Sequence, residues 1–176
     1  MDFARVLESV CGYLEQREVR YAVIGGLGLA AYGMARTTLD VDLVVDGEAQ
    51  QELVGFLSGL GYATLHRSEG YSNHEHPDPD WGGVDVVYVR GETSERLFEG
   101  ARAVSGPRGR ELPVPRPEHL AAMKVLAMKN DPTRTFQELA DIRFLLELPG
   151  VDRSEVRGYF ERHGLAERYR ELEATL

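Results

Sequence analysis

One run of sequence, residues 23–45, most constrains what this chain can fold into. It opens with apolar residues that enter the pair Gly25 and Gly26, and it closes with an apolar strand that carries Asp40 and Asp42. Side chains two apart on a strand point to the same face, so the two acids share one face. Their Cα atoms lie roughly 7 Å apart at the usual rise of a strand. Two carboxylates at this spacing can share a divalent cation.

A third acid strengthens this interpretation. Asp85 lies in the apolar stretch 84–89, which predicts a second strand of the same kind. Hard cations prefer oxygen ligands, and three carboxylates without a cation repel one another. The alternative is that Asp40, Asp42 and Asp85 form the solvent-facing half of ordinary alternating strands. The glycine pair upstream and the acid downstream favour the metal site over this alternative.

These residues together resemble the nucleotidyltransferase superfamily, whose fold is that of the polymerase beta palm. Its pattern is an apolar residue, a Gly-Gly or Gly-Ser pair, Asp-x-Asp on a strand and a third acid on a later strand. The chain is similar to short bacterial members of the AbiEii/AbiGii type or the antibiotic type, over about residues 20–146. The resemblance implies transfer of a nucleoside monophosphate from a nucleoside triphosphate (NTP), ATP for example, to a hydroxyl. The acceptor would be a small molecule such as an antibiotic, an RNA 3′ end or a protein.

The resemblance also implies roles for individual residues. Asp40, Asp42 and Asp85 would be catalytic and would hold Mg²⁺, with two ions expected. An arginine before the acids could contact the triphosphate, although an ordinary surface position for this arginine is nearly as well supported. A lysine on a later apolar helix would lie near the phosphates; the alternative is a lysine whose head reaches solvent at the helix edge. The expected nucleotide-binding residues are Gly25, Gly26, Arg36, Thr38 and Lys124.

The glycine pair has a physical reason to be there, and also a simpler one. Glycine lets a backbone approach phosphate oxygens closely and adopt positive φ. Gly25 and Gly26 could equally serve a tight strand-to-helix turn that needs small residues only for packing.

One departure from the AbiEii-like pattern bears on function. Many such proteins carry Lys-Asp-x-x-Asp on the next helix, where this chain has Gln137, Glu138 and Asp141. The change weakens the case for a toxin more than the case for the fold. A catalytically idle binding protein, such as a toxin–antitoxin component, is the second hypothesis.

Charge is unevenly distributed along the chain. The net charge is −9, with 7 basic and 17 acidic side chains in residues 1–100 but 7 basic and 3 acidic in residues 101–136. An acidic total disfavours broad nucleic-acid binding, which depends on phosphate neutralisation, so RNA is a less favoured partner. An acidic cleft attracts cations, which weakly favours a small cationic acceptor. Oligomeric state is left open, a homo-oligomer included.

The pattern of elements predicts an α/β (α+β) fold with a mixed sheet flanked by helices. Residues 1–115 would form this core, and residues 116–176 a helical segment packed on it. The sequence predicts helices over 2–17, 27–34, 50–60, 135–148 and 165–174 and another that begins at residue 117. A further helix is expected after Asp152, because the spacing from Asp152 to Glu155 is that of a capping box. Expected strands are 21–24, 38–45, 62–66 and 84–89, with a short helix and strand within 92–104.

The polar, proline-containing stretch 68–82 predicts a loop or an irregular hairpin, and residues 112–115 an extended connector. Within the first, His74 and His76 could chelate a metal, but solvated loop residues are the favoured reading. Trp81 could stack on a base, although packing at the sheet edge is favoured. Cys11 is expected to fill the core, and a single cysteine suits a reducing cytosol.

Location follows from two further features. No apolar run approaches the roughly 20 residues that span a bilayer. The first residues lack the basic region and cleavage site of a signal peptide. A cytoplasmic protein without membrane partners is expected.

Overall fold

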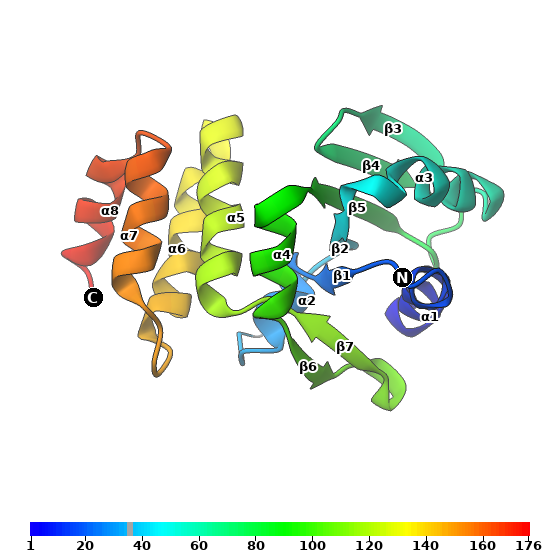
Figure 1. Cartoon of the computed structure of the whole chain (residues 1–176), viewed down its shortest axis with the longest axis horizontal. Coiled ribbons are helices and arrows are strands. Elements are labelled where there is room, and N and C mark those ends of the chain that lie inside the picture. The colour runs from blue at the N-terminus through cyan, green and yellow to red at the C-terminus, as the bar shows by residue number, and fades with distance from the viewer. Residues whose placement is uncertain (35–36) are drawn as a thin grey trace. The chain divides into compact units, whose positions relative to one another are not determined.

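The computed structural model describes residues 1–34 and 37–176, and the chain divides into two compact units (Figure 1). Unit 1 comprises residues 1–115 and contains the sheet. Unit 2 comprises residues 116–176 and is helical. No helix in the described part of the chain is long and apolar enough to cross a membrane.

Unit 1 is built on a five-stranded mixed sheet in the order β1-β2-β5-β4-β3. The strands β2 and β5 are parallel, and the other neighbours are antiparallel. The predicted α/β class with a mixed sheet is confirmed. The strands are β1 (Tyr21–Val23), β2 (Asp40–Asp46), β3 (Ala63–Arg67), β4 (Tyr71–Glu75) and β5 (Gly83–Val89).

Two amphipathic helices supply much of the core of unit 1. They are α1 (Phe3–Gln16) and α3 (Gln50–Gly59), and the rings of Tyr13 and Phe56 stack between them at 3.9 Å. Cys11 is fully buried on the stripe of α1, as expected, and burial raises the pKa of its thiol to about 12. The buried positions of α1 recur at helical spacing: Val6, Leu7, Val10, Cys11 and Leu14.

Of the two predictions for residues 68–82, the strand β4 contradicts a loop and agrees with an irregular hairpin. It pairs with both β3 and β5, and its alternate side chains Ser72 and His74 are fully buried. Burying two polar side chains is tolerable only when they find partners. The imidazole Nε2 of His74 lies 2.8 Å from Ser72 Oγ, and Ser72 Oγ lies 2.9 Å from the hydroxyl of Tyr88 on β5. On the other side, His74 Nδ1 lies 3.1 Å from Thr64 Oγ1 on β3.

The remaining elements of unit 1 lie around this sheet. Residues 112–114 are extended as predicted, but they are not a mere connector, because they belong to β7 (Glu111–Val114), which pairs with β6 (Arg102–Ser105) in a hairpin. The helices are α2 (Gly25–Ala30) and α4 (Gly91–Glu99), with short 3₁₀ turns at Gly47–Ala49 and Pro107–Gly109.

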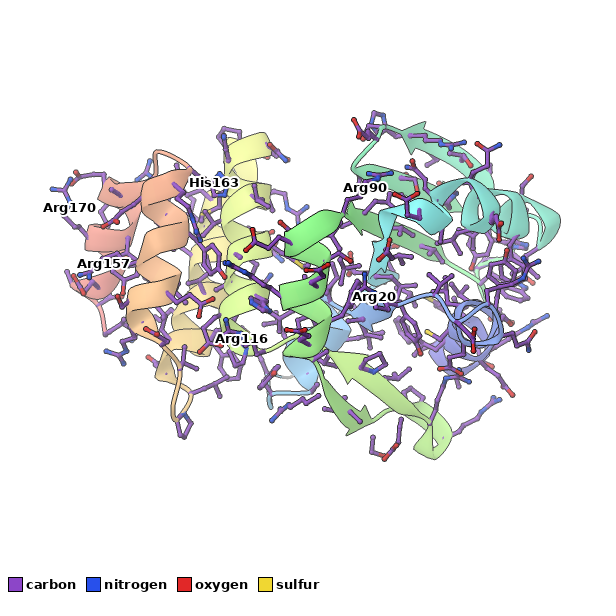
Figure 2. The ribbon with its side chains drawn as sticks, viewed as in Figure 1. Arg20, Arg90, Arg116, Arg157, His163 and Arg170 are labelled. Carbon is purple, nitrogen blue, oxygen red and sulfur yellow. The ribbon has the colours of Figure 1, made fainter. Side chains whose placement is uncertain are left out.

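Two arginines tie loops to the sheet in unit 1 (Figure 2). Arg20 donates to Asp46 at the end of β2, at 2.6 Å, and to Ser94 on α4, at 3.1 Å. Arg90 donates to the carbonyl oxygens of Gly47 and Glu69, at 2.9 and 3.0 Å. These bonds fix the end of the sheet opposite the start of β2.

Unit 2 consists of helices that lie side by side in Figure 1. Arg116 stands at its start and donates twice to the carboxylate of Glu155, at 2.6 and 2.8 Å. Asp152 caps the next-to-last helix as predicted, accepting from the amide of Glu155 at 3.1 Å. The capping box is not reciprocal, because the amide of Asp152 donates instead to Glu118 at 2.8 Å. The helices are α5 (Pro117–Asn130), α6 (Thr135–Glu147), α7 (Arg153–Arg162) and α8 (Ala166–Glu173), with a 3₁₀ turn at Pro132–Arg134.

Candidate active site

The register of the parallel strands brings the three acids onto adjacent positions. Asp42 on β2 pairs directly with Asp85 on β5, and Asp40 pairs with Gly83. Residues that alternate with the acids, such as Val41 and Val84, are fully buried. Because alternate side chains face opposite sides of a sheet, the carboxylates lie together on its more open face, which we call the acid face.

Electrostatics shows that the carboxylates on this face influence one another. Burial raises the pKa of Asp40, and the negative charges of Asp85 and Glu75 raise it further. Glu75 belongs to the same row of the sheet as Asp40, since both pair with Gly83 from opposite sides. Like charges this close disfavour the ionised form, and a bound cation would reverse that effect.

Gly25 lies directly against one of these carboxylates. Its φ is +58°, and a Cβ placed on it would stand 2.7 Å from Cβ of Asp42 and overlap the carboxylate. The preceding amide, that of Ile24, donates to the carbonyl of Asp42 at 2.9 Å. Only glycine combines this positive φ with so close an approach of backbone to side chain. The turn therefore presents bare backbone beside the acid face.

Gly26 and Thr38 also lie together. A Cβ on Gly26 would stand 2.8 Å from Cβ of Thr38, and Thr38 Oγ1 donates to the carbonyl of Asp40 at 3.2 Å. The structure thus gathers Gly25, Gly26 and Thr38 around the start of β2. Arg36 lies outside the described residues.

Lys124 belongs to α5 in unit 2, where it is 7% exposed. Its ammonium donates to Glu138 at 2.8 Å and to Asp141 at 2.5 Å, both on α6. The alternative of a lysine whose head reaches solvent is wrong, because burial of the side chain requires these carboxylate partners. Its role at the phosphates stays a prediction.

Asn73 is a residue of the acid face that the sequence did not reveal. It pairs with Asp85 across β4 and β5, and its side-chain amide donates to Asp85 Oδ1. Recognising it required the strand β4, whose polar sequence resembles a loop. No other signal in the sequence distinguishes it.

The histidines and the tryptophan of the same segment have structural surroundings. His76 Nδ1 accepts from the amide of Asp78 at 3.0 Å, and its Nε2 donates to the carbonyl of Leu60 at 3.2 Å. Both nitrogens are thus engaged, and His74 is buried as described, so neither is a solvated loop residue nor a ready metal ligand. Trp81 lies under the guanidinium of Arg5, 4.3 Å from its ring centroid, which fits the packing role.

The donor set of the acid face suits a hard divalent cation, because Asp40, Asp42 and Asp85 offer carboxylate oxygens on two adjacent strands. Across residues 1–34 and 37–176, no three ligating side chains already form a group able to hold a metal ion.

A family model described as Aminoglycoside-2''-adenylyltransferase matches residues 6–88, which contain all three acids. Residues 6–88 are thus similar to a family of nucleotidyltransferases. Of the two types expected, this match supports the antibiotic type. A search of curated proteins found no match.

Solved structures of antibiotic-resistance proteins share the fold of the chain. The solution structure of the antibiotic-resistance factor ANT(2'')-Ia has 17% identity and a TM-score of 0.68, and covers 99% of this chain and 98% of its own. Its crystal structure in complex with adenylyl-2''-tobramycin has 15% identity, a TM-score of 0.67 and coverage of 94% and 97%. The lincosamide adenylyltransferase LnuA, bound to lincomycin, has 18% identity, a TM-score of 0.54 and coverage of 81% and 96%.

Proposed function

We propose that this protein is a Mg²⁺-dependent nucleotidyltransferase that moves a nucleoside monophosphate from an NTP onto the hydroxyl of a small-molecule acceptor. One observation carries the proposal: Asp40, Asp42 and Asp85 share the acid face in adjacent register, with the bare backbone of Gly25 against Asp42. An idle protein has no need to keep three carboxylates together beside such a turn.

The residues divide the work of an in-line displacement. The acceptor oxygen forms a bond to the α-phosphorus, the bond from that phosphorus to the leaving oxygen breaks, and pyrophosphate departs. Asp40 and Asp42 would hold Mg²⁺, and Asp85 would hold the acceptor side and take the hydroxyl proton. When bound, Mg²⁺ neutralises phosphate charge and lowers the pKa of the attacking hydroxyl.

The glycine turn would receive the triphosphate. A Cβ on Gly25 or Gly26 would collide with Asp42 or Thr38, so only glycine lets the turn lie this close to the start of β2. A backbone without side chains would also let phosphate oxygens approach its amides closely. Arg36 and Lys124 are proposed as cationic partners of the phosphates.

The acceptor class follows from the charge of the acid face. Four carboxylates, those of Asp40, Asp42, Glu75 and Asp85, stand in neighbouring rows, and an acidic site concentrates cationic ligands. The similar structures named above include enzymes that adenylylate an aminoglycoside or a lincosamide. We therefore favour a polycationic, hydroxyl-rich antibiotic over RNA, and a cytoplasmic site of action, where NTP is abundant.

The test is transfer of label from α-labelled NTP. The purified protein is incubated with Mg²⁺, each of the four NTPs and a panel of aminoglycosides, lincosamides and tRNA. Wild type is expected to label one class of acceptor, and Asp42→Asn to lose at least about 100-fold in rate, because removal of a metal ligand removes transition-state charge stabilisation.

A matched control keeps the test specific. Asp80→Asn makes the same chemical change on an exposed residue outside the acid face, and it should retain the wild-type rate. Equal rates for wild type and Asp42→Asn on every acceptor would refute the proposal. The idle-protein alternative predicts, in addition, no rise in melting temperature with millimolar MgATP.

A further inference from the structure

We propose that Asn73 positions the catalytic carboxylate of Asp85, an inference that rests on the function proposed above. Asp85 occupies the central strand of a row that runs across three strands. Its neighbour on β2 is Asp42, and its neighbour on β4 is Asn73. One side of Asp85 therefore faces a like charge, and the other faces a neutral amide.

The hydrogen bond fixes which part of the carboxylate remains available. A carboxylate only accepts, so the amide must present its NH₂ to Asp85. Asn73 Nδ2 donates to Asp85 Oδ1, which leaves Oδ2 for the acceptor side of the site. With one oxygen tethered, the carboxylate cannot rotate freely to expose either oxygen.

The chemistry of asparagine suits this task. Lysine or arginine at the same position would also donate, but its charge would neutralise Asp85 and compete with a cation. An aspartate or glutamate at position 73 would repel the carboxylate of Asp85. The amide of Asn73 holds Asp85 and leaves its charge in place, which a metal ligand and proton acceptor both need.

The strand that carries Asn73 is itself held in register from its buried face. On either side of Asn73, Ser72 and His74 point into the core, where they bond to each other, to Tyr88 on β5 and to Thr64 on β3. A shift of β4 by one residue would break this buried network and exchange the two faces. The polar core of β4 thus keeps Asn73 opposite Asp85.

The test compares Asn73→Ala, Asn73→Asp and Asn73→Gln with wild type. Loss of a partner that orients a metal ligand typically lowers activity or metal affinity by about 10–100-fold. We expect Asn73→Ala to lower kcat by this factor while KM for NTP stays within about twofold, because the nucleotide contacts are untouched. Asn73→Asp should lose more, and Asn73→Gln, which keeps the amide, should recover part of the loss.

A second readout does not depend on turnover. Mn²⁺ alone, titrated by electron paramagnetic resonance, should bind Asn73→Ala more weakly than wild type by a similar factor. Glu69→Gln, an isosteric change in the exposed turn between β3 and β4, should match wild type in both measurements. If Asn73→Ala does not fold, the nearly isosteric Asn73→Asp decides.

The outcomes separate this inference from the function on which it rests. Wild-type kcat and Mn²⁺ affinity in Asn73→Ala would overturn the positioning role and leave nucleotidyl transfer intact. Failure of wild type to label any acceptor would overturn the proposed function, and the Mn²⁺ titration would then judge Asn73 by itself. Absence of Mn²⁺ binding by wild type would overturn both.

Discussion

Replacing Lys124 by methionine tests how much unit 2 depends on its buried charges. The side chains of Glu138 and Asp141 are each 1% exposed and that of Lys124 9%, so solvent screens this cluster little. Arg134 also approaches Glu138, at 2.6 Å. Lys124→Met fills a similar volume but removes the ammonium that Glu138 and Asp141 both contact. Removing one partner from a buried pair typically costs about 3–5 kcal/mol, and we expect that loss here.

The assay must report on unit 2. The single tryptophan, Trp81, lies in unit 1, so its fluorescence would follow the wrong unit. Amide hydrogen exchange over α5 and α6 measures the free energy of opening directly. Lys129→Met, on an exposed residue in the last turn of α5, is the matched control and should change it by less than about 0.5 kcal/mol.

A compensating change sharpens the reasoning. Asp141→Asn removes one of the two carboxylates that lose their ammonium in Lys124→Met. The double variant Lys124→Met, Asp141→Asn should therefore be more stable than Lys124→Met alone. A loss below about 1 kcal/mol in Lys124→Met, or a double variant less stable than Lys124→Met alone, would refute the account of buried charge. Comparing NTP affinity of Lys124→Met with wild type tests its separate, predicted role at the phosphates.

Two further predictions concern the histidine of unit 2 and the glycine turn. Burial and the neighbouring Arg116 lower the pKa of His119, although the negative charges of Glu155 and Glu118 partly offset this shift. As pH falls, the histidine therefore takes up a proton in the unfolded chain before it does so in the folded protein. The free energy of unfolding should then decrease as pH drops below about 6.5. Thermal melting between pH 7.5 and 5.5 should show this fall, and His119→Gln should reduce it; an unchanged slope would contradict the assignment. Gly25→Ala, at φ +58° and against Asp42, should destabilise unit 1 by about 1–3 kcal/mol and abolish labelling, whereas Gly55→Ala, with open space around it, should do neither. Chemical denaturation followed through Trp81 fluorescence measures the stability of both variants. A stable, active Gly25→Ala would contradict the proposed contact.

Sequence reasoning recovered the parts of the fold that carry apolar periodicity. The stripe of α1 and the alternating strands β2 and β5 were all visible, because nearly all of their buried positions are filled by apolar side chains. The strand β4 was missed because its buried positions hold Ser72 and His74, which satisfy one another only in three dimensions. The strand β7 was missed because Pro113 is rare within a sheet and is tolerated here in a two-stranded hairpin.

The candidate site shows the same division. The spacing of Asp40 and Asp42 predicts a shared face. The glycine pair predicts a close approach to phosphate or a tight turn, and the contact of Gly25 with Asp42 was not predicted. Asn73 could not be predicted, because its role depends on a register that only the buried network of β4 reveals. The partners of Lys124 were also hidden, since Glu138 and Asp141 were noted only as a departure from a family pattern.

The parallel pairing of β2 with β5 has a consequence for how the protein acquires its chemistry. The segment between these strands contains α3, β3 and β4, and it must form a closed loop before Asp42 can pair with Asp85. Such long-range closure is slow and entropically unfavourable until the intervening elements are in place. A nascent or partly folded chain therefore has no assembled acid cluster, and catalytic competence should be among the last properties to emerge during refolding.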